Sequence, residues 1–138
     1  MLLRYSGLRI SDGVFIDKTR FSGSTVRLYT AKTGTHVSVP LPDKVVEAMK
    51  GINYSFIENP EAKAKHAVGS YQRSLRRMEC GVSDLHAHRL RDTFAVELLV
   101  KGVPISDVSV LLGHSSVKIT EKHYAPWVKA RQDRLLNL

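Results

Sequence analysis

The chain has 138 residues, enough for one domain with a single hydrophobic core and too few for two. It carries 21 lysines and arginines against 13 aspartates and glutamates, and this net charge of +8 favours a polyanionic partner, either a nucleic acid or an anionic membrane surface. A lone cysteine, Cys80, excludes an internal disulfide and fits a reducing cytosol, and the sequence has neither a secretory signal nor an apolar run near the ~18 residues of a membrane span.

The first residues predict a helix. Leucines and an isoleucine at positions 2, 3, 8 and 10 favour a helix that contains Arg9 among apolar neighbours. A guanidinium in such a setting needs an anionic partner or a set of hydrogen bonds. Because no N-cap residue precedes this helix, we expect the chain to be cut from something longer.

A β-hairpin and a short helix are predicted next. Apolar and polar residues alternate over 25–30 and again over 35–39, as they do in half-buried strands, and Lys32-Thr-Gly34 forms a turn between them. Pro42 and Asp43 then open a helix that ends near Gly51, where glycine suits a left-handed cap.

From Pro60 onward the chain is predicted to be helical almost to its end. Glycines at 81, 102 and 113 mark helix ends, Pro104 begins one helix, and Ser115 or Ser116 can cap another. Leu90, Phe94, Leu98 and Leu99 form an apolar stripe at helical spacing, and Pro126 separates the last helix from a tail rich in leucine and basic residues. The predicted fold is therefore mainly α with a small antiparallel β-sheet.

Several side chains suited to phosphate chemistry lie within these elements. His88 and Arg91 are three apart and share one helix face, a pattern that alone is usually a solvated basic surface. His114 follows the helix-ending Gly113, and Tyr124 comes ten residues later. With Arg9, and with Lys32 on the hairpin turn, the set comprises two guanidiniums, two imidazoles, an ammonium and a phenol.

This set suits the transfer of a phosphodiester to a hydroxyl group. The pentacoordinate transition state gains negative charge on its non-bridging oxygens, which planar arginine forks neutralise bidentately. A phenol with an ordinary pKa of about 10 needs a base or a positive field to attack near neutrality. The departing oxygen needs a proton, which a lysine on a turn can supply.

The same segments resemble the tyrosine recombinase (phage integrase) family in order and spacing. The resemblance rests on the blocks GLRISD at 7–12, KTG at 32–34, VPLP at 39–42, HRLRDTFA at 88–95, LLGHSS at 111–116 and TEKHY at 120–124. It implies that Arg9 and Arg91 bind the phosphate, Lys32 is the general acid, and His88 acts in proton transfer and positioning. It further implies that His114 hydrogen-bonds the phosphate and that Tyr124 becomes the covalent phosphotyrosine.

The resemblance also sets expectations for the whole molecule. It implies site-specific recombination of double-stranded DNA through a 3′-phosphotyrosine, without cofactor or metal, in a bacterial or phage nucleoid-associated cytoplasmic setting. Residues 1–138 would form a single catalytic domain, with the family's N-terminal core-binding domain and the opening catalytic helices missing, so that activity of the isolated chain is expected to be weak or lost. Other protomers are expected partners through exchange of the C-terminal tail, which in a free monomer we expect to dock in cis.

Other interpretations of the same residues are possible. A type IB topoisomerase-like nicking and closing activity uses nearly the same side chains, and a non-catalytic DNA-binding remnant would keep the fold without the reaction. The histidines at 86, 88, 114 and 123 do not have zinc-site spacing, so no metal site is predicted. Asp92, which stands where many family members have a second histidine after the arginine, is placed outside the catalytic set. Trp127 is predicted either to pack in the core or to lie near the active site.

Overall fold

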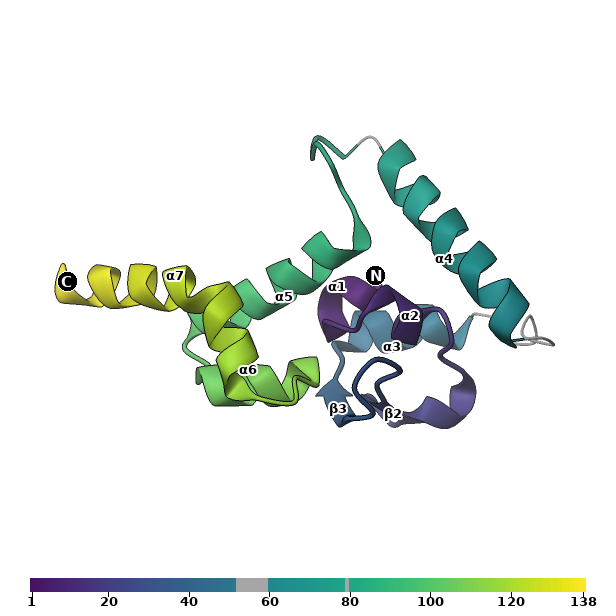
Figure 1. Ribbon diagram of the computed structural model, residues 1–138, viewed down its shortest axis with the longest axis horizontal. Helices are drawn as coiled ribbons and strands as arrows, with labels where there is room; N and C mark the ends of the chain where they lie inside the picture. The colour runs from purple at the N-terminus through teal and green to yellow at the C-terminus, as the bar shows by residue number, and fades with distance from the viewer. Residues whose placement is uncertain (52–59, 79) are drawn as a thin grey trace.

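The protein is mainly helical with one small sheet, as predicted. A computed structural model describes residues 1–51, 60–78 and 80–138 (Figure 1). The helices are α1 (Leu2–Ser6), α2 (Ile10–Gly13), the 3-10 turn η1 (Lys18–Arg20), α3 (Asp43–Lys50), α4 (Pro60–Arg77), α5 (Ala87–Lys101), α6 (Ile105–Leu112) and α7 (Val117–Leu136). The strands are β1 (Phe21–Ser22), β2 (Thr25–Tyr29) and β3 (His36–Pro40), paired antiparallel in the order β1-β2-β3.

The predicted N-terminal helix is broken into two short ones. Gly7 adopts a left-handed backbone conformation (φ 66°) that ends α1, and a Cβ at this position would collide with the Phe94 ring. Arg9 therefore lies at the N-cap of α2 and not inside a helix, which corrects the prediction. The break turns the backbone carbonyl of Gly7 toward α5.

The hairpin confirms the predicted strands and their register. Val26 lies opposite Val39 and Leu28 opposite Val37, so the apolar residues of both strands share the buried face. Strand β1 adds two residues at the edge of β2, too few to leave an alternating pattern in the sequence.

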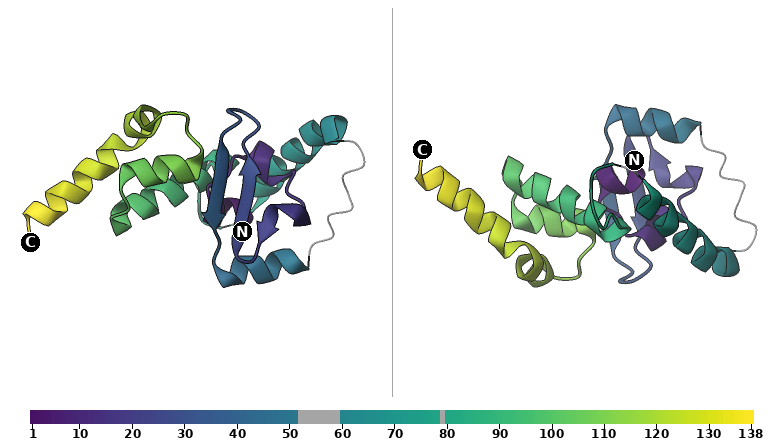
Figure 2. Two further views of the ribbon diagram at one scale, coloured as in Figure 1. Left: turned by 90° about the horizontal axis from the view of Figure 1, so that it is seen from below. Right: turned by 90° about the horizontal axis from the view of Figure 1, so that it is seen from above.

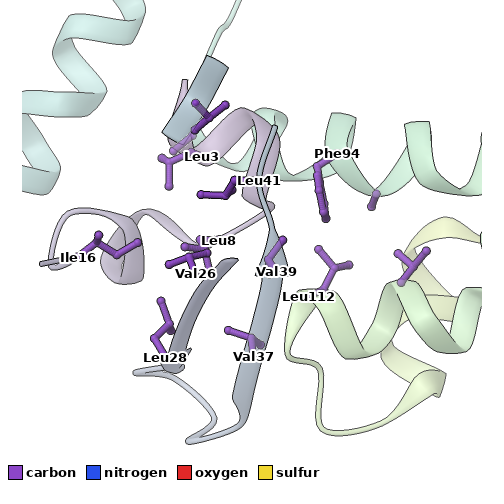
Figure 3. Packing of buried hydrophobic residues seen from close by; sticks show 14 of the residues in the cluster. Leu3, Leu8, Ile16, Val26, Leu28, Val37, Val39, Leu41, Phe94 and Leu112 are labelled. Atoms are coloured by element: carbon purple, nitrogen blue, oxygen red, sulfur yellow. The ribbon is translucent and has the colours of Figure 1, made fainter. Parts of the chain in front are cut away.

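The hydrophobic core lies on both sides of β3. Figure 3 shows Leu8, Val26 and Ile16 on one side, and Phe94 of α5 and Leu112 of α6 on the other. Helix α5 also packs along α1 and α7, while α4 lies apart from α6 and contacts α2 (Figure 1). In the part of the chain that the structure describes, no helix is long and apolar enough to cross a membrane.

Most of the predicted helix ends are confirmed. Gly102 and Gly113 cap α5 and α6 in left-handed conformations, and the Ser116 hydroxyl accepts a hydrogen bond from the Lys118 amide at the start of α7. Helix α3 also ends before Gly51, but Gly51 has φ −81°, so the expected left-handed cap was wrong there.

The C-terminal tail differs most from the prediction. Helix α7 continues through Pro126 as one element, and its second half extends away from the rest of the chain (Figures 1 and 2). Leu135 is 50% exposed and Leu136 is 83% exposed, so docking of the tail in cis was wrong. Proline removes one intrahelical hydrogen bond and favours a kink, but the remaining backbone hydrogen bonds continue the helix beyond it.

Candidate active site

Arg91 joins three segments of the chain. It is 3% exposed on α5, and its guanidinium donates to the carbonyl oxygens of Gly7 and of Leu112, the latter at 2.7 Å. Its Nη2 also lies 3.2 Å from Nε2 of His114. Burial, and after it the neighbouring charge of Arg9, lowers the pKa of Arg91 to about 10, so this side chain remains cationic at neutral pH.

His114 is fixed from both sides of its ring. Because a guanidinium only donates, Nε2 of His114 is the acceptor toward Arg91, and Nδ1 carries the hydrogen that it donates to the Thr120 hydroxyl at 2.7 Å. Thr120 is fully buried on α7. Burial, then the charges of Arg91 and Arg9, lowers the pKa of His114 to about 4, so the ring is neutral at pH 7.

Arg9 and Arg91 line one hollow, which we call the arginine hollow. It has a volume of about 270 Å³ and is also lined by His86, His88 and Gln72. Nη1 of Arg9 is buried and has no hydrogen-bond partner among the described residues. A buried guanidinium nitrogen without an acceptor, next to a second guanidinium, is suited to bind an anionic oxygen.

Tyr124 lies in a second hollow, the tyrosine hollow, of about 580 Å³. The phenol donates a hydrogen bond to Oδ1 of Asp92 at 2.7 Å, and the residue is 5% exposed. Burial first, and then the hydrogen bond to Asp92, raises the pKa of the Tyr124 phenol well above its ordinary value. Trp127 is half exposed and lines this hollow with Tyr124, so of its two predicted places it takes the one beside the candidate site.

His88 connects the two hollows, since it lines both. Its Nε2 lies 3.7 Å from Oδ1 of Asp92, one helical turn further along α5. The side chain of His88 is 66% exposed, so solvent reaches the imidazole.

Lys32 lies on the exposed turn between β2 and β3, and this turn is held against the end of α6. The Thr33 hydroxyl donates to the carbonyl oxygen of Gly113 at 3.2 Å, directly before His114. The Ala31 amide donates to Oδ1 of Asp12 at 2.8 Å. Asp12 is 6% exposed, and its second carboxylate oxygen has no partner among the described residues. Through Asp12, the helix that follows Arg9 is tied to the turn that carries Lys32.

The structure therefore brings five of the six predicted site residues to adjoining surfaces. Arg9, His88 and Arg91 share the arginine hollow, His114 contacts Arg91, and Tyr124 shares the tyrosine hollow with His88. Lys32 lies on the neighbouring turn. No group of three or more His, Cys, Asp or Glu side chains that could hold a metal ion occurs in the described residues.

Three residues of this arrangement were not predicted as site residues. Asp92 accepts the phenol hydrogen bond although it is predicted to lie outside the catalytic set, Asp12 accepts from the Ala31 amide, and the Thr120 hydroxyl is bonded to His114. Each of the three lies within one of the sequence blocks that resemble the tyrosine recombinase family, and this was the sequence signal that could have pointed to them. The contacts of Asp92 and Asp12 join residues 32 and 19 positions apart and depend on how α5, α7 and the hairpin pack, whereas Thr120 lies only six residues beyond His114.

Comparison with known proteins places the chain in a family. Residues 1–130 match the phage integrase family. A tyrosine recombinase from Pseudothermotoga lettingae is 34% identical over 129 residues, which covers 86% of this chain and 45% of that protein. A tyrosine recombinase from Thermosipho africanus is 36% identical over 132 residues, again with 86% and 45% covered, so the chain spans about half the length of these relatives.

The fold agrees with this match. The crystal structure of XerA recombinase superposes with a TM-score of 0.68 at 20% identity, covering 87% of this chain and 49% of that one. The catalytic domain of bacteriophage HP1 integrase is also similar, with a TM-score of 0.64 at 18% identity, covering 99% of this chain and 77% of that domain. The chain belongs to the phage integrase family and has the fold of a tyrosine recombinase catalytic domain.

Proposed function

We propose that this chain breaks and rejoins double-stranded DNA in site-specific recombination, with Tyr124 as the nucleophile. The observation that carries the proposal is the orphaned, buried Nη1 of Arg9 beside Arg91 in the arginine hollow. This hollow offers cationic donors to one phosphate group, and His88 connects it to the hollow that holds the Tyr124 phenol.

The reaction is a transesterification. The Tyr124 oxygen forms a bond to the scissile phosphorus while the bond from phosphorus to the 5′-oxygen breaks, leaving a 3′-phosphotyrosine and a 5′-hydroxyl. That hydroxyl, or one from a partner duplex, reverses the step. The phosphotyrosine retains the energy of the broken diester, so no ATP is required.

Each predicted residue has a role in this step. Arg9 and Arg91 stabilise the charge that develops on the non-bridging oxygens, and His114 hydrogen-bonds the phosphate. Lys32 protonates the departing 5′-oxygen, and His88 takes part in proton transfer from the tyrosine hollow. A phosphate oxygen only accepts, so when DNA binds, Nε2 of His114 must release Arg91 and carry the ring hydrogen, while Nδ1 accepts from the Thr120 hydroxyl.

We infer that the partners are double-stranded DNA and further protomers of the same kind. The net charge of +8 favours a polyanion, and a solved relative with this fold, XerH site-specific recombinase, is bound to its difH substrate. The exposed leucines at the end of α7 supply an apolar surface that a neighbouring protomer can cover. A bacterial or phage-infected cytoplasm, in association with the nucleoid, is the proposed location.

The test is to trap the covalent intermediate. A binding site is first selected by the protein from a random-sequence duplex pool and is then synthesised with a nick near the cleavage point, so that the released fragment diffuses away. We expect a denaturant-resistant adduct with the wild-type chain that Tyr124→Phe does not form and that persists in EDTA.

Different outcomes would overturn separate parts of the proposal. Specific binding with no adduct would contradict cleavage and favour a DNA-binding remnant. An adduct that depends on added Mg²⁺ would contradict stabilisation by the side chains alone. Relaxation of supercoiled DNA by a monomer, without joining of two sites, would favour a topoisomerase-like activity.

A further inference from the structure

The Tyr124 phenol is paired with a carboxylate. Its hydroxyl donates to Oδ1 of Asp92 at 2.7 Å, a distance normal for a strong hydrogen bond to an anionic acceptor. Asp92 directly follows Arg91 on α5, and successive helix residues project about 100° apart. Arg91 therefore points into the core while Asp92 points toward α7 and the tyrosine hollow.

Among the described residues, Asp92 is the only side chain that is hydrogen-bonded to the phenol. His114 is engaged on both ring nitrogens, by Arg91 and by Thr120. The centroid of the His123 ring lies 6.3 Å from that of the Tyr124 ring, and His88 lies next to Asp92, 3.7 Å from the same carboxylate oxygen. Arg9 and Arg91 favour an anionic phenol oxygen but cannot accept a proton.

We propose that Asp92 is a catalytic residue, the general base that takes the phenol proton as Tyr124 attacks. The proposal rests on the proposed function, because it assigns a step of that same reaction. As the bond from the Tyr124 oxygen to phosphorus forms, the phenol proton moves to Oδ1 of Asp92, and the bond to the 5′-oxygen breaks as Lys32 protonates it. His88, beside Asp92 and open to solvent, then carries the proton away.

Two physical arguments indicate that Asp92 acts as a base and does not only hold the phenol in position. The phenol pKa is raised, so Tyr124 does not ionise before the attack at neutral pH and must lose its proton during it. In addition, Asp92 becomes neutral when it takes the proton. The tyrosine hollow therefore loses a negative charge while negative charge develops on the phosphorane oxygens next to the arginines. A carboxylate that stayed charged would repel those oxygens.

The first test compares single-turnover cleavage of the nicked duplex by three variants of the chain. Asp92→Asn keeps a carbonyl oxygen that can accept the phenol hydrogen bond but removes the base, and Asp92→Ala removes both. Asp107→Asn, which removes one exposed carboxylate on α6, is the matched control. We expect both Asp92 variants to cleave about 10²–10⁴-fold more slowly at neutral pH and to recover part of this rate as pH rises, while the control matches the wild type.

Other results would overturn the proposal. If Asp92→Asn cleaved like the wild type while Asp92→Ala was slow, Asp92 would only hold the phenol. If both variants cleaved faster, Asp92 would be a restraint on the nucleophile. If the wild-type chain formed no tyrosine adduct, the proposed function would fail, and the role of Asp92 as its base would fail with it.

A second measurement needs no DNA and tests the Asp92 contact separately from the proposed recombination reaction. The phenol of Tyr124 is titrated by NMR in protein labelled at the tyrosine ζ-carbon, with the signal assigned by its loss in Tyr124→Phe. We expect the phenol pKa to fall in Asp92→Asn and in Asp92→Ala, and to stay unchanged in Asp107→Asn. An unchanged pKa in the two Asp92 variants would show that the contact is absent and would overturn the proposal even if recombination were confirmed.

Discussion

Arg91 has a structural role as well as a proposed chemical one. Its guanidinium donates hydrogen bonds to backbone carbonyl oxygens at the ends of two helices, those of Gly7 after α1 and of Leu112 in α6, and thereby fixes the segments that present Arg9 and His114. A charge that is buried to this degree costs desolvation energy, which the three contacts offset. The residue that is proposed to bind the phosphate also holds its partners in place.

Replacing Arg91 should therefore destabilise the fold. Lysine is shorter in its reach and lacks the planar fork, so Arg91→Lys leaves at least one buried carbonyl without a partner. We expect a loss of about 2–4 kcal/mol in the free energy of unfolding, measured by urea denaturation. Arg89→Lys on the exposed face of the same helix is the control and should change stability by less than about 0.5 kcal/mol. Equal stability of the two variants would contradict a structural role for Arg91.

His114 should make stability depend on pH in a defined window. Its pKa is about 4 in the folded chain and about 6.5 in the unfolded chain, so the unfolded state binds the proton first as pH falls. The contribution of neutral His114 to the free energy of unfolding is present in full above about pH 6.5 and is lost as the pH falls toward 4. His114→Gln should flatten the fall of the unfolding free energy in this window, whereas His66→Gln on the exposed face of α4 should not. Parallel curves for His114→Gln and the wild type would contradict the lowered pKa.

At the scale of elements, local sequence patterns predicted the features that depend on neighbouring residues, namely strands, turns and helix ends. Alternation over β2 and β3 gave the hairpin, and Gly102 and Gly113 marked helix ends because a left-handed cap is accessible to glycine. The predicted helix end at Pro126 was wrong because proline disfavours helix continuation without forbidding it, and α7 runs through this residue.

The proline cost in α7 can be measured. Pro126→Ala restores a backbone N–H and removes the clash with the carbonyl of the preceding turn, so we expect unfolding to become about 1–3 kcal/mol less favourable. Far-ultraviolet circular dichroism and urea denaturation would check this. Pro104→Ala is the control, because this proline lies at the N-cap of α6 and interrupts no helix hydrogen bond. A Pro126→Ala variant that was no more stable than the wild type would show that the helix gains from its kink.

At the scale of the whole molecule, the sequence predicted a set of candidate site residues but not the contacts that they make. Arg9, Lys32, His88, Arg91, His114 and Tyr124 were chosen because their side chains suit phosphate transfer and their blocks resemble one family. The pairing of Tyr124 with Asp92, and of His114 with Thr120, depends on the packing of α7 against α5 and α6. Asp92 and Tyr124 lie on different helices, which no spacing rule connects, and His114 meets Thr120 through the path of the chain between α6 and α7.

The end of α7 presents apolar residues that the chain itself does not cover. Leu135, Leu136 and Leu138 are 50%, 83% and 97% exposed, so replacing them by serine removes little buried surface. We expect the triple serine variant to unfold within about 1 kcal/mol of the wild type in urea, because exposed positions contribute little to stability. We also expect it to bind one DNA half-site normally and to lose assembly of protomers on a full site, measured by native gel mobility and by the mass of the complexes. The control is Val110→Ser, which removes a valine that is 66% exposed on α6 and should leave assembly intact. If the triple variant assembled and recombined DNA as the wild type does, the exposed tail would not be a contact between protomers.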